Sequence, residues 1–158
     1  MSTHNYLITT EWTGNKGQGT AGYRSYSRDH RFISQGKADI AGSSDPAFLG
    51  DPTRHNPEEL LLASLSSCHM LWYLHLCAEA GISVTAYTDR ATAKMDDGSA
   101  TTPGRMTEVM LRPEVTIGVG DPEQALALHA QAHRMCFIAN SCNFPVRHEP
   151  VISAEADT

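Results

Sequence analysis

The feature of this sequence that most constrains its fold is a long apolar segment without a charged side chain. From Leu60 to Ala78 the chain contains no Asp, Glu, Lys or Arg. Asn56 and Pro57 come just before it, an order typical of an N-cap and the first residue of a helix, and Gly81 is a typical helix stop. We therefore predict a helix over residues 57–80. Because most of its faces are apolar, such a helix has to lie centrally and be covered on more than one side.

A membrane-spanning helix also needs about 20 apolar residues in a row. This segment is interrupted by serines and histidines and is closely flanked by glutamates: Ser64, Ser66, Ser67, His69, His75, Glu58, Glu59 and Glu79. We therefore expect a helix buried in protein, and no membrane partner. A chain of 158 residues has little surface with which to cover such a helix on every side, so we also expect a homodimer that buries it.

Both predicted helices carry a cysteine on an apolar stripe. Spacings of three and four residues place five side chains on one face of the first helix: Leu61, Leu65, Cys68, Trp72 and Leu76. Asp121 is a typical N-cap for a second helix. A second stripe follows it: Leu128, Ala132, Cys136 and Ala139. The first and third cysteines of the chain therefore belong to the helical faces most suited to a core.

The remaining segments with β-branched and alternating residues predict strands. They cover residues 6–12, 23–33, 82–95 and 108–120, and a last strand begins at Val146. Residues 41–57 contain two Asp-Pro steps and one Asn-Pro step, which indicates a loop, and Pro113 predicts an edge strand or a bulge. The order of elements predicts an α+β fold with mainly antiparallel sheet, in a single domain over residues 1–158.

Composition and charge exclude several classes of protein. The net charge is -6 and no basic stripe is present, so we expect no nucleic-acid partner. The first residues lack the basic start and apolar core of a secretory signal, which predicts a cytoplasmic protein. In that reducing compartment we expect free thiols at all the cysteines: Cys68, Cys77, Cys136 and Cys142. No Cys-x-x-Cys pair is present, so we expect no bound metal.

A thiol on an apolar stripe becomes reactive only if a nearby cation stabilises its thiolate. His69 follows Cys68 directly, but neighbouring positions on a helix point about 100° apart, so it is a poor partner. The alternatives are four arginines: Arg24, Arg28, Arg31 and Arg54. Spacing alone does not choose among them. Cys77, further along the same helix, is interpreted as a small buried hydrophobe.

Two motifs resemble those of the OsmC/Ohr family, named after osmotically inducible protein C and the organic hydroperoxide resistance proteins. In one, Asn56-Pro57-Glu58 is followed by Cys68, ten residues after the glutamate. In the other, an Ala-His sequence near the end of the second helix leads to Cys136. The order of elements extends the resemblance along nearly the whole chain. It implies an OsmC-like fold, in which antiparallel sheets wrap around the two central helices of an intertwined homodimer.

The resemblance also implies an activity, that of a thiol-dependent peroxidase for alkyl or fatty-acyl hydroperoxides. Cys68 would be the thiolate that attacks the peroxide. Cys136 would resolve the resulting sulfenic acid by forming a Cys68–Cys136 disulfide. Glu58 would hold an arginine beside Cys68, with Arg54 and Arg24 as the leading candidates. No bound cofactor is implied, because an external dithiol electron donor, such as a lipoyl protein, would reduce the disulfide.

Helix geometry adds a condition to this scheme. Ten residues of straight helix span about 15 Å, so Glu58 and Cys68 of one helix cannot share one site. Either the helix bends or Glu58 serves the Cys68 of a partner chain, and we favour the second. Apolar neighbours such as Leu65 and Trp72 would form a pocket wall that suits an alkyl hydroperoxide better than hydrogen peroxide.

Some residues depart from the better-known Ohr pattern and keep other interpretations open. Cys136 is followed by Phe137 where proline is usual, and Cys68 by His69 where an aromatic residue is usual, which indicates a less characterised OsmC-like branch. Cys142 is an alternative resolving thiol. Other interpretations are a small-molecule or lipid-binding protein without peroxidase activity and a thiol that handles sulfur or acyl groups. A further interpretation is a metal site formed by His69, His75, Cys77 and His133.

Overall fold

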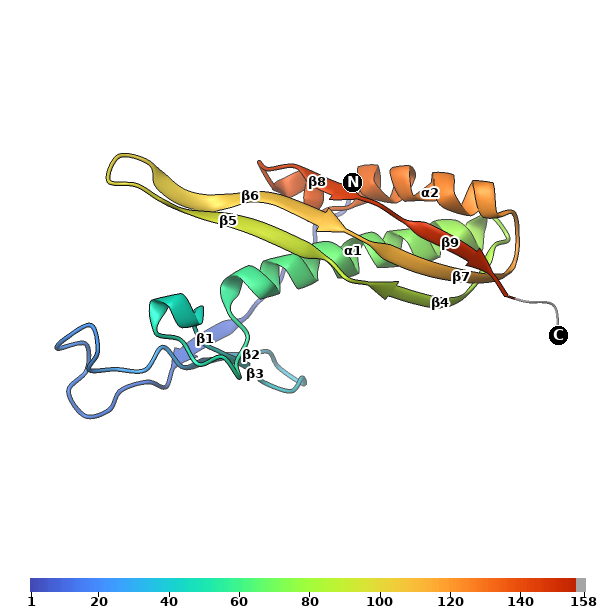
Figure 1. Cartoon of the computed structure of the whole chain (residues 1–158). Helices are drawn as coiled ribbons and strands as arrows, with labels where there is room; N and C mark the ends of the chain where they lie inside the picture. Colours follow the sequence, from blue (N-terminus) through green and yellow to red (C-terminus); the bar gives the residue numbers. More distant parts are fainter. Residues whose placement is uncertain (156–158) are drawn as a thin grey trace. The chain divides into compact units, whose positions relative to one another are not determined.

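The apolar segment forms α1 (Pro57–Glu79), one continuous helix in the computed structural model, which describes residues 1–155 (Figure 1). Reciprocal hydrogen bonds close its first turn. The Glu59 N–H donates to Oδ1 of Asn56 at 2.8 Å, and the Asn56 N–H donates to Oε2 of Glu59 at 3.3 Å. Gly81 follows the helix with a φ of +72°, which glycine adopts without strain. The predicted helix is confirmed, with its end one residue earlier.

The buried face of α1 differs from the predicted one. Four side chains at intervals of four residues are at most 1% exposed: Leu65, His69, Tyr73 and Cys77. Of the predicted stripe only Leu65 belongs to this set, while Cys68 and Trp72 are half-buried. The prediction was wrong because it left histidine out of the stripe, whereas His69 has a hydrogen-bond partner inside the protein, His129, and can occupy a core position.

The chain divides into two units, residues 1–60 and residues 61–158. The first contains an antiparallel sheet of short strands in the order β1-β2-β3. The bounds of these strands are β1 (Thr9–Trp12), β2 (His30–Ile33) and β3 (Ile40–Gly42). The segment predicted as a loop contains the end of β3 and a short 3-10 helix, η1 (Pro46–Phe48), and is otherwise irregular as expected.

Only the end of the strand predicted over residues 23–33 is a strand. The Arg28 guanidinium donates hydrogen bonds to the carbonyls of Tyr23 at 2.6 Å and Tyr26 at 2.8 Å. It also lies over both tyrosine rings, 4.5 and 4.1 Å from their centroids. These contacts hold the preceding residues in a local loop, because carbonyls that bind one side chain are not free to pair with a neighbouring strand.

The second unit contains two three-stranded sheets and the helix α2 (Pro122–Met135). One sheet has the order β4-β7-β9 and the other β5-β6-β8. The bounds are β4 (Ser83–Asp89), β5 (Thr92–Gly98), β6 (Pro103–Leu111), β7 (Pro113–Val119), β8 (Val146–His148) and β9 (Val151–Ala154), with a 3-10 helix η2 (Ala139–Ser141). Only β8 and β9 are added in parallel. The prediction of an α+β fold with mainly antiparallel sheet is confirmed.

Each long strand predicted after α1 is two strands, because the chain passes from one sheet to the other. At the first crossing, the Asp89 carboxylate accepts hydrogen bonds from the Ser66 hydroxyl at 2.5 Å and the Arg112 N–H at 2.7 Å. Pro113 begins β7, the middle strand of its sheet, so the predicted edge position was wrong. A proline is tolerated there because it is the first residue of the strand.

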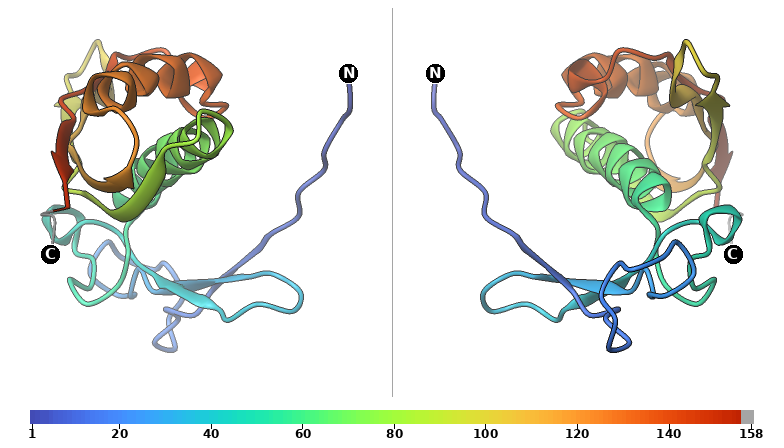
Figure 2. Two further views of the ribbon diagram at one scale, coloured as in Figure 1. Left: turned by 90° about the vertical axis from the view of Figure 1, so that its right-hand side faces the viewer. Right: turned by 90° about the vertical axis from the view of Figure 1, so that its left-hand side faces the viewer.

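Two apolar clusters along α1 form the core of the second unit. In one, Tyr73 and Cys77 of α1 pack with residues of α2 and β7: Ala125, Ala132, Val115 and Ile117, together with Ile82. The other contains Leu65, Val109 and Leu111. Figure 2 shows α2 beside α1, with strands of the second unit along one side of these two helices. Both helices that carry the candidate thiols are therefore anchored in one core.

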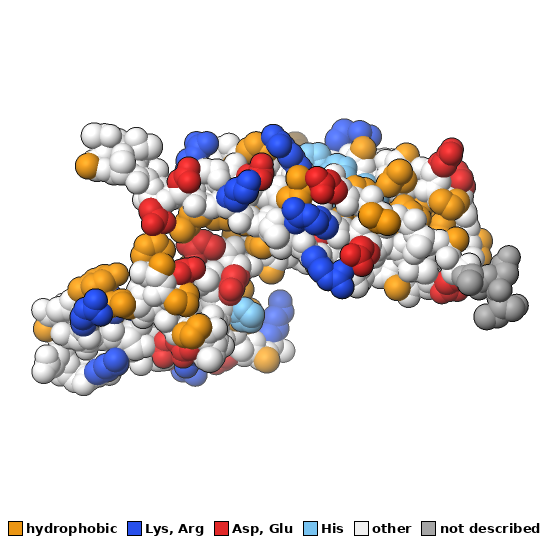
Figure 3. All heavy atoms as spheres, viewed as in Figure 1, with side chains coloured by type: hydrophobic (Ala, Val, Ile, Leu, Met, Phe, Trp, Pro, Cys, Tyr) orange, Lys and Arg blue, Asp and Glu red, His pale blue; other side chains and the backbone are white. Residues whose placement is uncertain are grey.

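Besides the apolar side chains that they contribute to the core, the strands β5, β6 and β8 carry ion pairs that are partly exposed. Lys94 and Arg147 lie 3.1 and 3.6 Å from the carboxylate of Glu108, and Arg112 lies 3.8 Å from that of Glu149. Figure 3 shows basic and acidic side chains interspersed over this face. Exposed pairs of this kind contribute little to stability, which therefore rests on the two apolar clusters.

Candidate active site

The thiols of Cys68 and Cys136, predicted as a reactive pair, come together in the second unit. Cys68 lies on α1 and is half-buried, whereas Cys136 is the first residue after α2 and is 1% exposed. The two thiols face each other closely enough that Cys68 contributes to the pKa of Cys136. Both are free. The packing of α2 against α1 thus joins two cysteines that lie far apart in the sequence.

The end of α2 determines how the Cys136 thiol is held. The Cys136 N–H donates to the carbonyl of His133 at 3.3 Å, after which the backbone becomes extended. Its Sγ accepts a hydrogen bond from the Ala139 N–H at 3.5 Å. Burial raises the pKa of Cys136 to about 11, the Ala139 N–H opposes this change, and Cys68 adds to it. Cys136 therefore keeps its proton at neutral pH and faces Cys68 as a thiol.

The other two cysteines have different surroundings. The Cys142 thiol donates a hydrogen bond to the carbonyl of Ile138 at 3.3 Å and packs on the cluster around Leu65. Cys77 is 1% exposed in the other cluster, as its interpretation as a core residue requires. Burial raises the pKa of both thiols. Geometry therefore places Cys136, rather than Cys142, against Cys68.

The arginines predicted to assist the thiolate all lie in residues 1–60, and their local contacts distinguish them. Nε of Arg54 lies 3.6 Å from the carboxylate of Asp29 and 3.8 Å from that of Asp51, which offset its charge. Arg28 is held by the carbonyls and rings described above and has no carboxylate partner within residues 1–155. Arg24 is exposed and forms no hydrogen bond or ion pair within the described part of the chain. The charges of Arg24 and Arg28 are thus the least compensated.

Arg31, the fourth candidate, is bound by carboxylates within the sheet of residues 1–60. Its guanidinium lies 2.8 Å from the Glu11 carboxylate and 3.4 Å from that of Asp39. Both contacts hold the side chain along β2 and its neighbours. Like Arg54, it therefore has little uncompensated charge to offer a thiolate.

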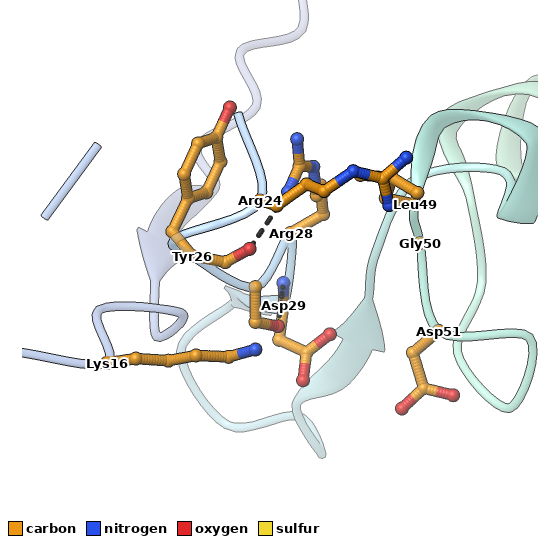
Figure 4. A pocket seen from close by; sticks show the side chains of 9 residues that line it. Lys16, Arg24, Tyr26, Arg28, Asp29, Leu49, Gly50 and Asp51 are labelled. Atoms are coloured by element: carbon orange, nitrogen blue, oxygen red, sulfur yellow. Dashed lines mark hydrogen bonds between the residues drawn. The ribbon is translucent and has the colours of Figure 1, made fainter. Parts of the chain in front are cut away.

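A cavity of about 420 Å³ lies between Arg24 and Arg28 and the loop after β3. Figure 4 shows the two guanidinium groups near each other, with Lys16 and two carboxylates further along the lining. The carboxylates are those of Asp29 and Asp51. Three basic and two acidic side chains give the cavity a net positive lining, suited to a negatively charged group.

Glu58 lies in the first turn of α1 and is half-buried. A carboxylate is favourable at this position because it faces the positive end of the helix dipole. Within residues 1–155, however, it forms no hydrogen bond or ion pair, so the expected contact between Glu58 and an arginine is not made inside the described chain. Its role across a dimer remains a prediction.

Three apolar side chains within four residues of Cys68 or Cys136 in the sequence are called the apolar rim below: Leu71, Trp72 and Phe137. Phe137 directly follows the second thiol and is 67% exposed, and Leu71 is 62% exposed. The Trp72 ring packs edge-on against that of Phe137, with centroids 5.4 Å apart. Leu65, expected as a pocket wall, is fully buried in the core, so that expectation was wrong. Periodicity missed Phe137 because it lies beyond the end of α2.

The residues proposed as a metal site are not brought together. His75 is exposed and packs against Trp72 instead. Among residues 1–155, no group of three or more His, Cys, Asp or Glu side chains is arranged to hold a metal ion. The structure instead groups four imidazoles: His69, His129, His133 and His148. His129 and His148 were not predicted as site residues, although the four-residue spacing of His129 and His133 places both on one face of a helix.

Comparison with known proteins relates this chain to one family. Residues 50–150 match the family model described as OsmC-like protein. Among solved structures, an OsmC-like protein of unknown function from Vibrio cholerae is 32% identical in sequence. It superposes with a TM-score of 0.83 over 96% of this chain and 100% of that one.

More distant structures share the fold. An organic hydroperoxide resistance protein from Legionella pneumophila is 16% identical, with a TM-score of 0.63 over 96% of this chain and 99% of its own. Another, from Elizabethkingia anophelis, is 18% identical, with a TM-score of 0.63 over 98% and 100%. Among curated proteins, no sequence matches this chain.

Proposed function

Because the chain belongs to the family of OsmC-like proteins, we propose that it is a thiol-dependent peroxidase that reduces organic hydroperoxides. The observation that carries this proposal is the pairing of a half-exposed Cys68 thiol with a buried Cys136 thiol. Such a pair supplies a nucleophile that substrate can reach and a second thiol that can resolve its oxidised form. Two more distant structural relatives are described as organic hydroperoxide resistance proteins.

In the proposed reaction the Cys68 thiolate attacks the terminal oxygen of the hydroperoxide and the O–O bond breaks. The products are a Cys68 sulfenic acid and an alkoxide, which takes a proton from solvent and leaves as an alcohol. The Cys136 sulfur then displaces the sulfenic oxygen, which leaves as water with the Cys136 proton, and a Cys68–Cys136 disulfide forms. An external dithiol, for which a lipoyl protein is suited, supplies two electrons and two protons and restores both thiols. The scheme needs no bound cofactor.

The environment of Cys136 supports this order of events. Its raised pKa keeps it protonated at neutral pH, so it can donate a hydrogen bond toward a Cys68 thiolate without competing as the nucleophile. Its burial keeps it away from substrate until the sulfenic acid forms beside it. These are the properties expected of a resolving thiol.

Activation of Cys68 requires a cation, and we propose that Arg24 or Arg28 provides it. Neither has a carboxylate partner within residues 1–155, whereas two carboxylates offset the charge of Arg54. Glu58 lies ten residues before Cys68 on the continuous helix α1, about 15 Å along its axis. We therefore propose that Glu58 acts across a homodimer, whose interface would cover the exposed apolar side chains of α1 such as Leu71.

The apolar rim supports an alkyl or fatty-acyl hydroperoxide as substrate. Trp72 and Phe137, which are close in sequence to Cys68 and Cys136 and pack against each other, offer apolar surface for a hydrocarbon chain. Hydrogen peroxide has no group that would gain from such contacts. Four free cysteines also support a reducing compartment, the cytoplasm.

The activity is tested by mixing the fully reduced protein with cumene hydroperoxide or a fatty-acid hydroperoxide and counting free thiols. The proposal expects the loss of two thiols per chain and the formation of cumyl alcohol from cumene hydroperoxide. Peptide mass mapping should find the Cys68 and Cys136 peptides joined by a disulfide. Cys142→Ser serves as the matched control and should give the same result. Full retention of free thiols with excess hydroperoxide would refute the proposal and favour a binding protein with the same fold.

The shared site is tested by complementation between chains. Glu58→Ala and Cys68→Ser chains, each inactive alone under the proposal, are mixed, unfolded and refolded together. Heterodimers should regain activity, because one of their two sites then contains both an intact Glu58 and an intact Cys68. Sedimentation of the wild-type chain as a monomer at micromolar concentration would contradict the dimer itself.

A further inference from the structure

A cluster of four imidazoles, three from α1 and α2 and one from a neighbouring strand, is not used by the proposed reaction. His69 comes from α1, His129 and His133 from α2, and His148 from β8. The centroid of the His148 ring lies 5.5 Å from those of His69 and His133. Histidines are rarely gathered inside a core without a reason, because each carries polar atoms that need partners.

The centre of this cluster is a direct hydrogen bond between two buried rings. Nε2 of His69 and Nδ1 of His129 are 3.0 Å apart, and the two rings are 1% and 0% exposed. Their planes differ by 9° and their centroids are 5.3 Å apart, so the rings meet edge to edge. Tyr73 stacks on the face of His129, with centroids 3.8 Å apart. Packing therefore holds the His129 ring in the plane that the bond requires.

Neither ring has another polar partner. Nδ1 of His69 and Nε2 of His129 form no hydrogen bond within residues 1–155. One ring has to donate an N–H while the other accepts through a bare nitrogen, so two neutral rings with complementary tautomers satisfy the bond. Since it is the only hydrogen bond of both rings among the described residues, any sliding of the helices that breaks it leaves two buried polar groups unpaired.

The bond also differs in kind from the other contacts between the helices. Among side-chain hydrogen bonds of residues 1–155, it is the one that joins α1 to α2. The surrounding contacts, of Tyr73 with Ala125 and Ala132, are apolar. Apolar burial is non-directional and changes little over small shifts, whereas a hydrogen bond weakens steeply with distance and angle. The imidazole pair is therefore the most specific determinant of how the two helices align.

We infer that the bond between His69 and His129 positions the two thiols, by fixing the register of α1 against α2 so that Cys68 meets Cys136. His69 is next to Cys68 in the chain, and His129 lies seven residues, close to two helical turns, before Cys136. A slip of one residue along α1 would rotate Cys68 by about 100°, whereas a disulfide needs Cβ atoms about 3.5–4.5 Å apart. The inference rests on the proposed function, in which this disulfide is an intermediate.

Acid should weaken the alignment. Burial lowers the pKa of His69 to about 4 and that of His129 to about 3, and the neighbouring histidines add to both changes. The titratable groups that face the pair are Tyr73 of α1, His133 of α2 and His148 of β8. Within the described residues, no carboxylate is paired with either ring. A proton added to the pair is thus a buried charge without a counter-ion.

The test measures the effective concentration of the Cys68–Cys136 disulfide in glutathione redox buffers at pH 7, without peroxide, by alkylation and peptide mass mapping. Amide side chains probe the geometry at similar polarity. His69→Gln and His129→Asn keep an amide group near the imidazole nitrogen that forms the bond. His69→Asn and His129→Gln move the amide away from that position. We expect His69→Gln and His129→Asn to stay within about threefold of wild type, and His69→Asn and His129→Gln to fall about tenfold.

A core variant outside the cluster controls for simple loss of stability. Ile117→Ala removes apolar contacts in the same unit without touching an imidazole, and it should leave the effective concentration near the wild-type value. If all four histidine variants match wild type, or all four match one another, the inference is wrong. Disulfide formation in glutathione without turnover of hydroperoxide would instead refute the proposed function alone.

The wild-type chain provides a second test if the variants fail to fold. Between pH 7 and pH 5 the effective concentration should fall, with Cys68 shifting to mixed disulfides with glutathione. Titration of a thiolate would change the value in the opposite direction, because protonation removes a stabilisation of the reduced form. A value that is constant or rises on acidification would overturn the inference.

Discussion

Residues 1–60 and residues 61–155 contribute different parts of the candidate chemistry. Every buried apolar side chain of the core lies at Leu65 or beyond, whereas the buried polar residues Ser43 and Asn56 lie in the first unit. The four candidate arginines are all in residues 1–60, and both paired thiols are in the second unit. The second unit therefore contains the apolar core and the paired thiols, while the candidate arginines belong to the first.

This division separates two requirements that a peroxidatic thiol has to meet. Placement of a resolving thiol depends on packing between α1 and α2, which the second unit completes by itself. Stabilisation of a thiolate depends on a cation, and the least compensated of the four candidate arginines, Arg24 and Arg28, belong to loops of the first unit. Changes in the two units should thus affect different steps and be separable by experiment.

The largest effect is expected from removal of the nucleophile in the second unit. Cys68→Ser should lower the rate of cumene hydroperoxide consumption by roughly a thousandfold or more, as loss of a catalytic nucleophile does. A peroxide assay with ferrous ion and xylenol orange measures this rate. Cys77→Ser, on the same helix but in the core, should retain most activity; equal loss in both variants would contradict the assignment.

Stability should also depend on which unit is changed. Leu65→Ala removes a side chain that is 0% exposed and should lower the free energy of unfolding by about 2–5 kcal/mol. Leu7→Ala, at a side chain that is 88% exposed in the first unit, should change it by no more than about 0.5 kcal/mol. Urea unfolding followed by circular dichroism distinguishes the two. A larger loss of unfolding free energy for Leu7→Ala than for Leu65→Ala would contradict a stabilising core in the second unit.

Acid should destabilise the second unit through its buried imidazoles. His69 and His129 have folded-state pKa values of about 4 and about 3, both below the unfolded value of about 6.5. Their contribution is therefore complete above pH 6.5 and is lost as the pH falls toward 4, by up to about 2 kcal/mol for each ring at pH 5. Urea unfolding at pH 7.5 and pH 5 measures this loss. An equal free energy of unfolding at the two pH values would contradict this expectation.

The smallest effects are expected from the arginines of the first unit. If either arginine activates Cys68 as proposed, Arg24→Gln or Arg28→Gln should slow alkylation of Cys68 by iodoacetamide at pH 7 about tenfold, because the thiolate is the form that reacts. Arg54→Gln should have less effect, since Asp29 and Asp51 already offset that charge. If Arg54→Gln has the largest effect of the three, the ranking by local partners is wrong.

Local signals in the sequence were sufficient for several parts of the fold. Asn56, Pro57 and Gly81 mark the ends of α1, and Asp121 caps α2 by accepting hydrogen bonds from two backbone N–H groups. The ten-residue interval from Glu58 to Cys68 identified the resemblance to OsmC-like proteins, which the family match now supports. These features are readable because each depends on residues close together in the chain.

Other parts depended on contacts between distant segments. The long strand predicted over residues 108–120 is interrupted at Arg112 because the chain passes from one sheet to the other there. The segment before β2 is a loop because its carbonyls accept hydrogen bonds from the Arg28 side chain. The buried stripe of α1 contains His69 rather than Cys68 because a partner for that imidazole arrives from α2. None of these partners is visible in local periodicity.

The sequence by itself therefore determined the long central helix, the α+β class and the two cysteines of interest, through caps, turns and apolar spacing. Only the tertiary structure decided which thiol meets Cys68, which of the candidate arginines have a carboxylate partner, and which face of α1 lies in the core. The physical reason is that local signals restrict the backbone over a few residues, whereas burial and pairing of polar groups depend on side chains that the fold brings from elsewhere.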